Sequence, residues 1–164
     1  MKESNAKTIK EYLIYHDKYK QLYGNSTFIL MEVGSFYEVH CLESLDGNTC
    51  LGSDLDLLSD LTDLIKSTRQ IVVHNSEKYR LHMSGFPTHS QDKFIHKLLN
   101  ANYSVVLIDQ VGEHPNGSKI REVTRVLSPG TVIEEYNKKD NTGNNVISIV
   151  FNKGKDPSTK KPIY

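Results

Sequence analysis

The apolar residues of this chain form short clusters of two kinds, and their alternation limits the folds open to it. Stripes with helical spacing lie in residues 8–23, 54–65 and 88–99; extended stretches lie at 27–33, 36–41, 70–74, 79–83, 103–111 and 120–127. The resulting order is a helix followed by two strands, repeated three times. It predicts an α/β fold: a single domain with a mixed β-sheet flanked by about three helices.

Local signals place the ends of several elements. Gly24 and Asn25 should stop the first helix, and Ser53 or Asp54 should cap the second. The polar residues 75–78 predict a hairpin turn between two short strands. The apolar stripe of the second helix is expected to comprise Leu57, Leu58, Leu61, Leu64 and Ile65.

Length and composition exclude several classes of protein. The chain has 164 residues, of which 37% are apolar, enough for one domain with one core. It carries 20 Lys and Arg against 20 Asp and Glu, so it is not a polybasic tail. Its longest apolar runs have four residues, whereas a membrane helix needs about 20. The first residues contain no secretory signal, so we expect an intracellular protein with no membrane partner.

Motifs for chemistry are weak. Residues 112–119 approach a phosphate-binding loop, but serine precedes lysine and a strand follows, so a surface loop is expected. The seven histidines show no metal-ligand spacing. Cys41 and Cys50 are expected to be unpaired packing residues, as in a reducing compartment. No catalytic residue, metal or cofactor is predicted in this chain.

The charge is unevenly distributed. Residues 138–164 hold six lysines and two aspartates, a net charge of +4, and the remainder carries −4. We interpret 1–137 as the domain and 138–164 as a linker containing one strand, Asn145–Phe151, without a partner of its own. This predicts that the chain was cut from a longer protein.

Residues 34–39, Gly-Ser-Phe-Tyr-Glu-Val, are the most informative stretch. In an extended segment, Phe36 and Glu38 point to one side and Tyr37 and Val39 to the other. One side can enter the core, and the other then presents an aromatic ring beside a carboxylate. Taken alone, this pattern also fits a partly buried Phe36 and a solvated Glu38.

An ordered series of motifs resembles the N-terminal mismatch-recognition domain of the DNA mismatch repair ATPase MutS. Its Gly-x-Phe-Tyr-Glu signature matches Gly34–Glu38, and further matches follow in order over nearly the whole chain. They are Tyr12–Tyr23, Phe28–Glu38, Met83–His89, Leu98–Gly112, Arg121–Thr131 and Asn144–Ile149. The last of these resembles the opening strand of the family's next domain, the connector domain. Thr88 replaces the family's Tyr, Ser84 replaces its usual Ala, and residues 66–80 match poorly.

The resemblance implies roles for individual residues. Phe36 would wedge beside a mispaired base, and Glu38 would hydrogen-bond that base. Gly34 and Gly85 would meet backbone requirements of turns. Phosphate contacts are expected from Lys78 and Arg80, and less strongly from Lys66 and Arg69.

The resemblance also implies partners that the chain itself cannot reveal. Double-stranded DNA with mismatches or small loops would be the ligand, and the parent would be a dimeric ATPase. ATP and Mg would bind in the missing ATPase domain. Two alternatives come from other classes of function. One is a non-catalytic protein-interaction module that uses an exposed Phe36 face. The other is an enzyme acting alone, which no motif in the sequence supports.

Overall fold

The computed structural model describes residues 3–130, 154–155 and 162–163. Within residues 3–130, three α-helices and seven strands are present; they follow the predicted order except for one additional short strand, β3, between β2 and α2. The helices are α1 (Glu3–Tyr23), α2 (Leu55–Thr62) and α3 (Gln91–Asn100), the last preceded by a short 3-10 turn, Thr88–Ser90. The predicted linker strand Asn145–Phe151 lies outside the described residues. Beyond it, β8 (Gly154–Lys155) pairs with β9 (Pro162–Ile163).

The sheet is mixed, as predicted. Its order is β4-β5-β2-β1-β6-β7, with β3 paired to β2. The bounds are β1 (Thr27–Val33), β2 (Phe36–Ser44), β3 (Cys50–Gly52), β4 (Ser67–His74), β5 (Glu77–Pro87), β6 (Ser104–Glu113) and β7 (Lys119–Leu127). β1 and β6 run parallel, and the other pairs in this sheet are antiparallel.

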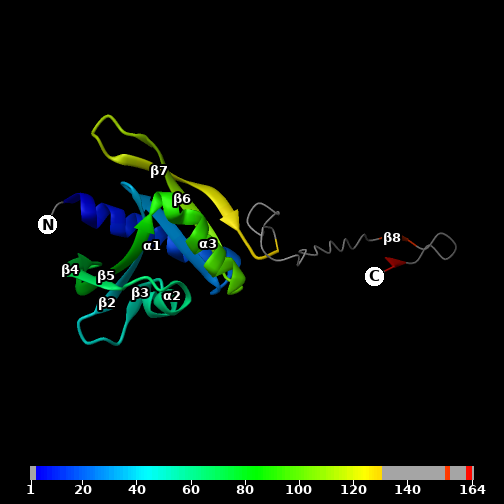
Figure 1. Cartoon of the computed structure of the whole chain (residues 1–164), viewed down its shortest axis with the longest axis horizontal. Helices are drawn as coiled ribbons and strands as arrows, with labels where there is room; N and C mark the ends of the chain where they lie inside the picture. Colours follow the sequence, from blue (N-terminus) through cyan, green and yellow to red (C-terminus); the bar gives the residue numbers. More distant parts are fainter. Residues whose placement is uncertain (1–2, 131–153, 156–161, 164) are drawn as a thin grey trace.

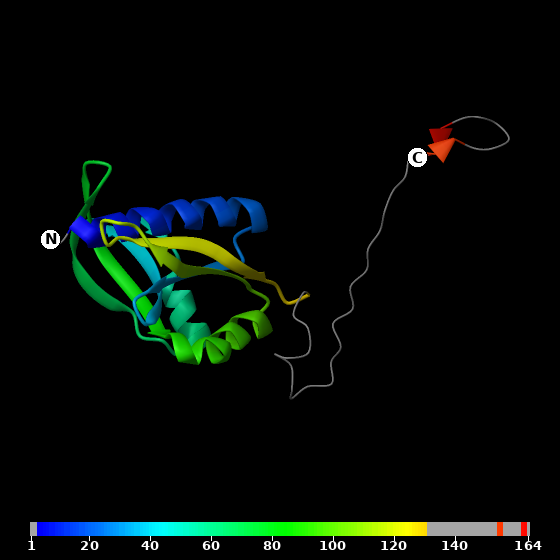
Figure 2. The same ribbon diagram turned by 90° about the horizontal axis from the view of Figure 1, so that it is seen from above.

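The elements form three layers (Figures 1 and 2). Helix α1 covers one face of the sheet, and α2 and α3 cover the other. The central strand β1 is buried over its first five residues, and Val105–Ile108 of β6 are fully buried beside it. Such runs are typical of strands covered on both faces. The core therefore lies on both sides of β1, β2 and β6.

The predicted helical stripe is confirmed for α3 and for most of α1, where Ile9, Tyr12 and Leu13 are buried but Tyr23 is exposed. The prediction is partly wrong for α2. Asp54 caps α2 by accepting hydrogen bonds from the backbone of Asp56 and Leu57. The helix then ends at Thr62, because Asp63 adopts a left-handed conformation with φ of 63°. Leu64 and Ile65 therefore lie beyond the helix, and the side chain of Ile65 is 82% exposed.

Both predicted loops are tight turns of hairpins. Asn75 and Ser76 join β4 to β5, each with a positive φ, the conformation of a two-residue hairpin turn. Residues 114–118 join β6 to β7, where the Gly117 amide donates to the His114 carbonyl. The phosphate-loop resemblance of 112–119 thus corresponds to a hairpin, and no helix follows it.

The prediction for the two cysteines is wrong. Cys41 of β2 and Cys50 of β3 form a disulfide, with Cα atoms 6.4 Å apart. Sequence spacing did not indicate this pairing, because β3 has only three residues and was not predicted. Once β3 pairs with β2, Cys50 lies opposite Glu43, two residues from Cys41 along β2, which is diagonally close enough for the bond.

Candidate functional site

A tight turn between β1 and β2 brings the signature residues to one end of the sheet. Gly34 has a φ of +65°, which an L side chain rarely adopts, and Val33 pairs directly with Phe36 across the turn. The Gln110 side chain donates to the Gly34 carbonyl. The predicted backbone role of Gly34 therefore has a physical basis in this turn.

The strand alternation expected for residues 36–39 is present in β2. Tyr37 and Val39 are buried toward α2 and α3, where the Tyr37 ring contacts that of Phe86 at 5.9 Å between centroids. Phe36 and Glu38 face the opposite side, where the Phe36 side chain is 45% exposed and that of Glu38 is 19% exposed. An aromatic ring and a carboxylate are thus presented together.

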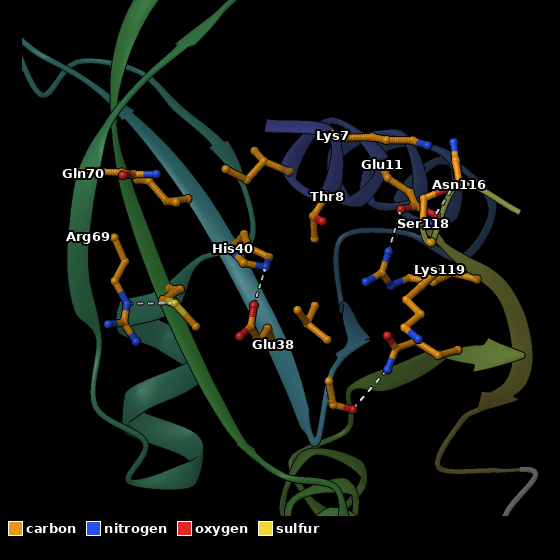
Figure 3. Close-up of a pocket in the computed structure, with 18 of the residues that line it drawn as sticks. Lys7, Thr8, Glu11, Glu38, His40, Arg69, Gln70, Asn116, Ser118 and Lys119 are labelled. Atoms are coloured by element: carbon orange, nitrogen blue, oxygen red, sulfur yellow. Dashed lines mark hydrogen bonds and ion pairs between the residues drawn. The ribbon is translucent and has the colours of Figure 1, made fainter. Parts of the chain in front are cut away.

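Two adjoining grooves flank Glu38. The larger, with a volume of about 1030 Å³, runs between α1, β4, β5 and the β6–β7 hairpin (Figure 3). The smaller, of about 500 Å³, is lined by Phe36 and by residues 63–65 that follow α2. Glu38, Arg69 and Met83 line both grooves. Glu38 therefore lies where the two grooves meet.

Gly85 keeps this region open, but not by forming a turn. It lies within β5, directly opposite Glu38. A Cβ atom at this position would come within 2.5 Å of the Tyr37 carbonyl oxygen. Glycine is therefore required by close approach of two backbones, and the absence of a side chain leaves space beside the carboxylate.

The four basic residues predicted to contact phosphates lie in different places. Arg69 lies at the bulge in β4, lines both grooves, and donates to the Met83 sulfur at 3.0 Å. Lys66 is held by the Asp56 carboxylate at 2.9 Å. Arg80 lies opposite Glu43 in the strand register. It is five positions from Gly85, or about 17 Å along β5. Lys78 lies farther still.

Three residues that line the larger groove were not predicted from the sequence. His40 continues the alternation of Phe36 and Glu38 on β2, and this spacing of two residues could have identified it. Lys7 and Lys119 approach the groove from α1 and β7 (Figure 3). Local sequence carries no signal for these lysines, because only the tertiary fold brings them together.

The described residues offer neither a cluster of metal ligands nor a membrane-spanning helix. No three or more His, Cys, Asp or Glu side chains within them are grouped as metal ligands. None of the helices described is both long and apolar enough to cross a membrane.

Comparison with known proteins places the chain in a family. The family model described as MutS domain I matches residues 14–136, three quarters of the sequence. The chain belongs to the MutS domain I family. The match contains the turn at Gly34, both signature side chains and most of the groove, and its fold is the single α/β domain described above.

Relatives of the chain carry the name DNA mismatch repair protein MutS. The protein from Listeria welshimeri is 29% identical over 151 residues, 90% of this chain and 15% of that protein. The protein from Thermosipho melanesiensis is 27% identical over 145 residues, 87% of this chain and 14% of that protein. The protein from Methanothrix thermoacetophila is 29% identical over 128 residues, which cover 77% of this chain and 13% of that protein. The chain thus spans about a seventh of their length.

Proposed function

We propose that the chain is the mismatch-recognition module of a MutS-type DNA mismatch repair protein. Phe36 inserts at a mispaired or unpaired base in kinked duplex DNA, and Glu38 hydrogen-bonds the displaced base. The observation that supports this is the pairing of a 45% exposed aromatic ring with a partly exposed carboxylate on one face of β2. Family membership supports DNA as the ligand.

Wedge insertion can discriminate without reading a base code. An apolar ring inserted at a base step costs about a few kcal/mol of unstacking and kinks the duplex. A mismatch pairs and stacks poorly, so this cost is lower there. Sensing of deformability suits a protein that accepts many different mispairs.

Glu38 adds a second layer of discrimination. A carboxylate near phosphates disfavours binding to fully paired DNA. It contributes favourably where a displaced base offers a hydrogen-bond partner. If that partner is an acceptor, such as a purine nitrogen, the carboxyl group must be protonated to donate.

Phosphate contacts near the wedge are assigned first to Arg69, because it shares both grooves with Glu38. Lys78 and Arg80, at the far end of β5, would reach phosphates farther along the duplex. Lys66 is already paired with Asp56 and contributes least. With so few contacts and zero formal net charge, the chain alone should bind DNA weakly and in a salt-sensitive way.

The test compares mismatched and fully paired duplexes of one sequence at low salt. Phe36→Ala should abolish the preference for the mismatch and retain phosphate contacts. Glu38→Ala should maintain or raise homoduplex affinity, and mismatch affinity should gain less or fall, so the ratio shrinks. Tyr37→Phe, on the opposite face, should leave the ratio unchanged, and Lys78→Ala should weaken both duplexes alike. A wild-type ratio in Phe36→Ala would overturn the wedge assignment.

The longer protein is part of the same proposal. We place the recognition domain at 1–137 and a linker with the start of a connector domain at 138–164. The parent would be a dimeric, intracellular ATPase that binds ATP and Mg outside this chain. A Walker motif several hundred codons downstream would support this, and a stop codon after residue 164 would contradict it.

The proposed domain boundary also predicts the effect of a truncation. Deleting 139–164 should barely change thermal stability.

A protein-interaction module is the second candidate. The balanced charge, with 20 basic and 20 acidic residues, favours it, because nucleic-acid-binding domains are commonly basic. The exposed Phe36 ring would then bind a protein partner. Equal affinity of the chain for mismatched and paired DNA, unchanged in Phe36→Ala, would support this alternative.

A further inference from the structure

The histidine next to Glu38 on the same strand face has an unusual environment. The His40 side chain is 5% exposed, and its Nε2 lies 3.2 Å from Oε2 of Glu38. Figure 3 shows the two side chains directed toward one another above the sheet. The edge of the ring meets Tyr12 of α1 at 5.0 Å between centroids. Helix and strand therefore fix the position of the imidazole.

Hydrogen bonding of this imidazole is incomplete. Neither His40 nitrogen has a hydrogen-bond partner, so the contact with Glu38 has the distance of an ion pair without the geometry of a hydrogen bond. A neutral imidazole carries one N–H donor and one acceptor nitrogen, and a buried donor without a partner is costly. The Glu38 carboxylate is the acceptor within reach of Nε2, and a small rotation of the longer Glu38 side chain would complete the bond.

We propose that His40 is a positioning residue for Glu38. This inference rests on the proposed function and adds the residue that orients its carboxylate. His40 donates Nε2–H to Oε2, which holds Glu38 at the junction of the two grooves and leaves Oε1 for the displaced base. The space beside Gly85 gives that oxygen access.

The neighbouring groups support this assignment. Arg69, the cation that shares both grooves with Glu38, is directed to the Met83 sulfur and not to the carboxylate. Met83 itself pairs with His40 across β2 and β5 and offers no proton donor. His40 is therefore placed to limit the conformations of a flexible carboxylate side chain before DNA binds, which lowers the entropic cost of the base contact.

The test is a double-mutant cycle on the mismatch-to-homoduplex affinity ratio. His40→Phe keeps an aromatic ring of similar size but removes the donor, and should lower the ratio by about two- to tenfold, the equivalent of one hydrogen bond. His40→Gln retains an N–H donor at the position of Nε2 and should restore most of it. In a Glu38→Ala background, His40→Phe should change nothing further, because its effect passes through Glu38.

The possible outcomes separate this inference from the proposed function. If Phe36→Ala and Glu38→Ala reduce the ratio and His40→Phe does not, the positioning role is wrong and the proposed function stands. If His40→Phe lowers the affinity ratio equally in the wild-type and Glu38→Ala backgrounds, His40 has a structural role and the inference is overturned. If Phe36→Ala and Glu38→Ala leave the ratio unchanged, both proposals fail.

A spectroscopic measurement on the chain without DNA tests the contact itself. Long-range ¹H–¹⁵N correlation of the imidazole should show a proton on Nε2 of His40. Glu38→Ala should shift the Nε2 resonance, and Lys78→Ala, at the far end of β5, should not. An Nε2 without a proton, or a spectrum insensitive to Glu38→Ala, would overturn the proposal whatever the DNA-binding results. Thermal unfolding of each variant establishes that it is folded.

Discussion

The two faces of β2 show how one strand serves stability and recognition separately. Toward α2 and α3, Tyr37 and Val39 are buried, and the Tyr37 hydroxyl donates to Asp109. Toward the grooves, Phe36 is half exposed and His40 lacks hydrogen-bond partners. The Tyr37 hydroxyl on the first face has a hydrogen-bond partner, and the His40 imidazole on the second has none. A buried polar group without a partner calls for an explanation, which the proposed contact with Glu38 provides.

The largest expected effect lies on the packed face. Phe86 is 1% exposed and stacks on Phe94 with 4.3 Å between ring centroids. Phe86→Ala should lower the free energy of unfolding by about 3–5 kcal/mol, because it removes a buried ring and leaves a cavity. Urea denaturation would measure this loss. A cost below about 1 kcal/mol would show that the aromatic cluster is not part of the core.

The disulfide should give the next largest effect. It closes a loop between positions nine apart in sequence. Replacing both cysteines with serine should lower the free energy of unfolding by roughly 2–3 kcal/mol, mostly by freeing the unfolded chain. Adding dithiothreitol to the wild type should shift the denaturation midpoint in the same direction. An unchanged midpoint would show that Cys41 and Cys50 are not paired in solution.

A smaller effect is expected at the Tyr37 hydroxyl. Burial and the adjacent Asp109 carboxylate raise the pKa of Tyr37, so it remains a donor at all ordinary pH values. Tyr37→Phe removes that donor, while Thr124 still donates to Asp109. The free energy of unfolding should fall by about 0.5–1.5 kcal/mol. Calorimetry would measure it, and a loss as large as that of Phe86→Ala would contradict the assignment.

The elements that the sequence predicted well are those with local signals. The stripes of α1 and α3, the alternation at Phe36 and the turn at Gly34 each depend on neighbouring residues. The end of α2 at Thr62 was not predicted, because Leu64 and Ile65 continue the apolar stripe beyond it and only the left-handed Asp63 stops the helix. Strand β3 and its disulfide were missed because three residues carry no periodicity.

The residues of the candidate site also fall into those that a local motif identifies and those that only the tertiary fold brings together. Phe36 and Glu38 could be identified from one motif, because a strand fixes their relative orientation. Arg69 could be placed in the groove only after the bulge in β4 was known. Lys7 and Lys119 lie 112 positions apart in sequence and share one groove, a long-range arrangement that periodicity cannot indicate.

A similarly small effect on stability is expected for Phe36→Ala, the same substitution as Phe86→Ala but on the opposite face of the sheet. Full burial of a phenylalanine contributes about 1.5–3 kcal/mol, and Phe36 is 45% exposed at the first position of β2. The loss should therefore be about 1 kcal/mol, well below that of Phe86→Ala. Urea denaturation of Phe36→Ala and Phe86→Ala in parallel would measure the difference between the two faces.

Phe36→Ala and Phe86→Ala compare the two faces of the sheet directly. The two substitutions remove the same atoms, so their effects on the unfolded chain are similar and the difference reports the folded environment. If Phe36→Ala were as destabilising as Phe86→Ala, the Phe36 ring would be a core residue, and its loss of mismatch preference would reflect unfolding. If it is nearly neutral, a loss of preference must come from the missing ring at the DNA. A ring that contributes little to folding and much to discrimination is what wedge insertion requires.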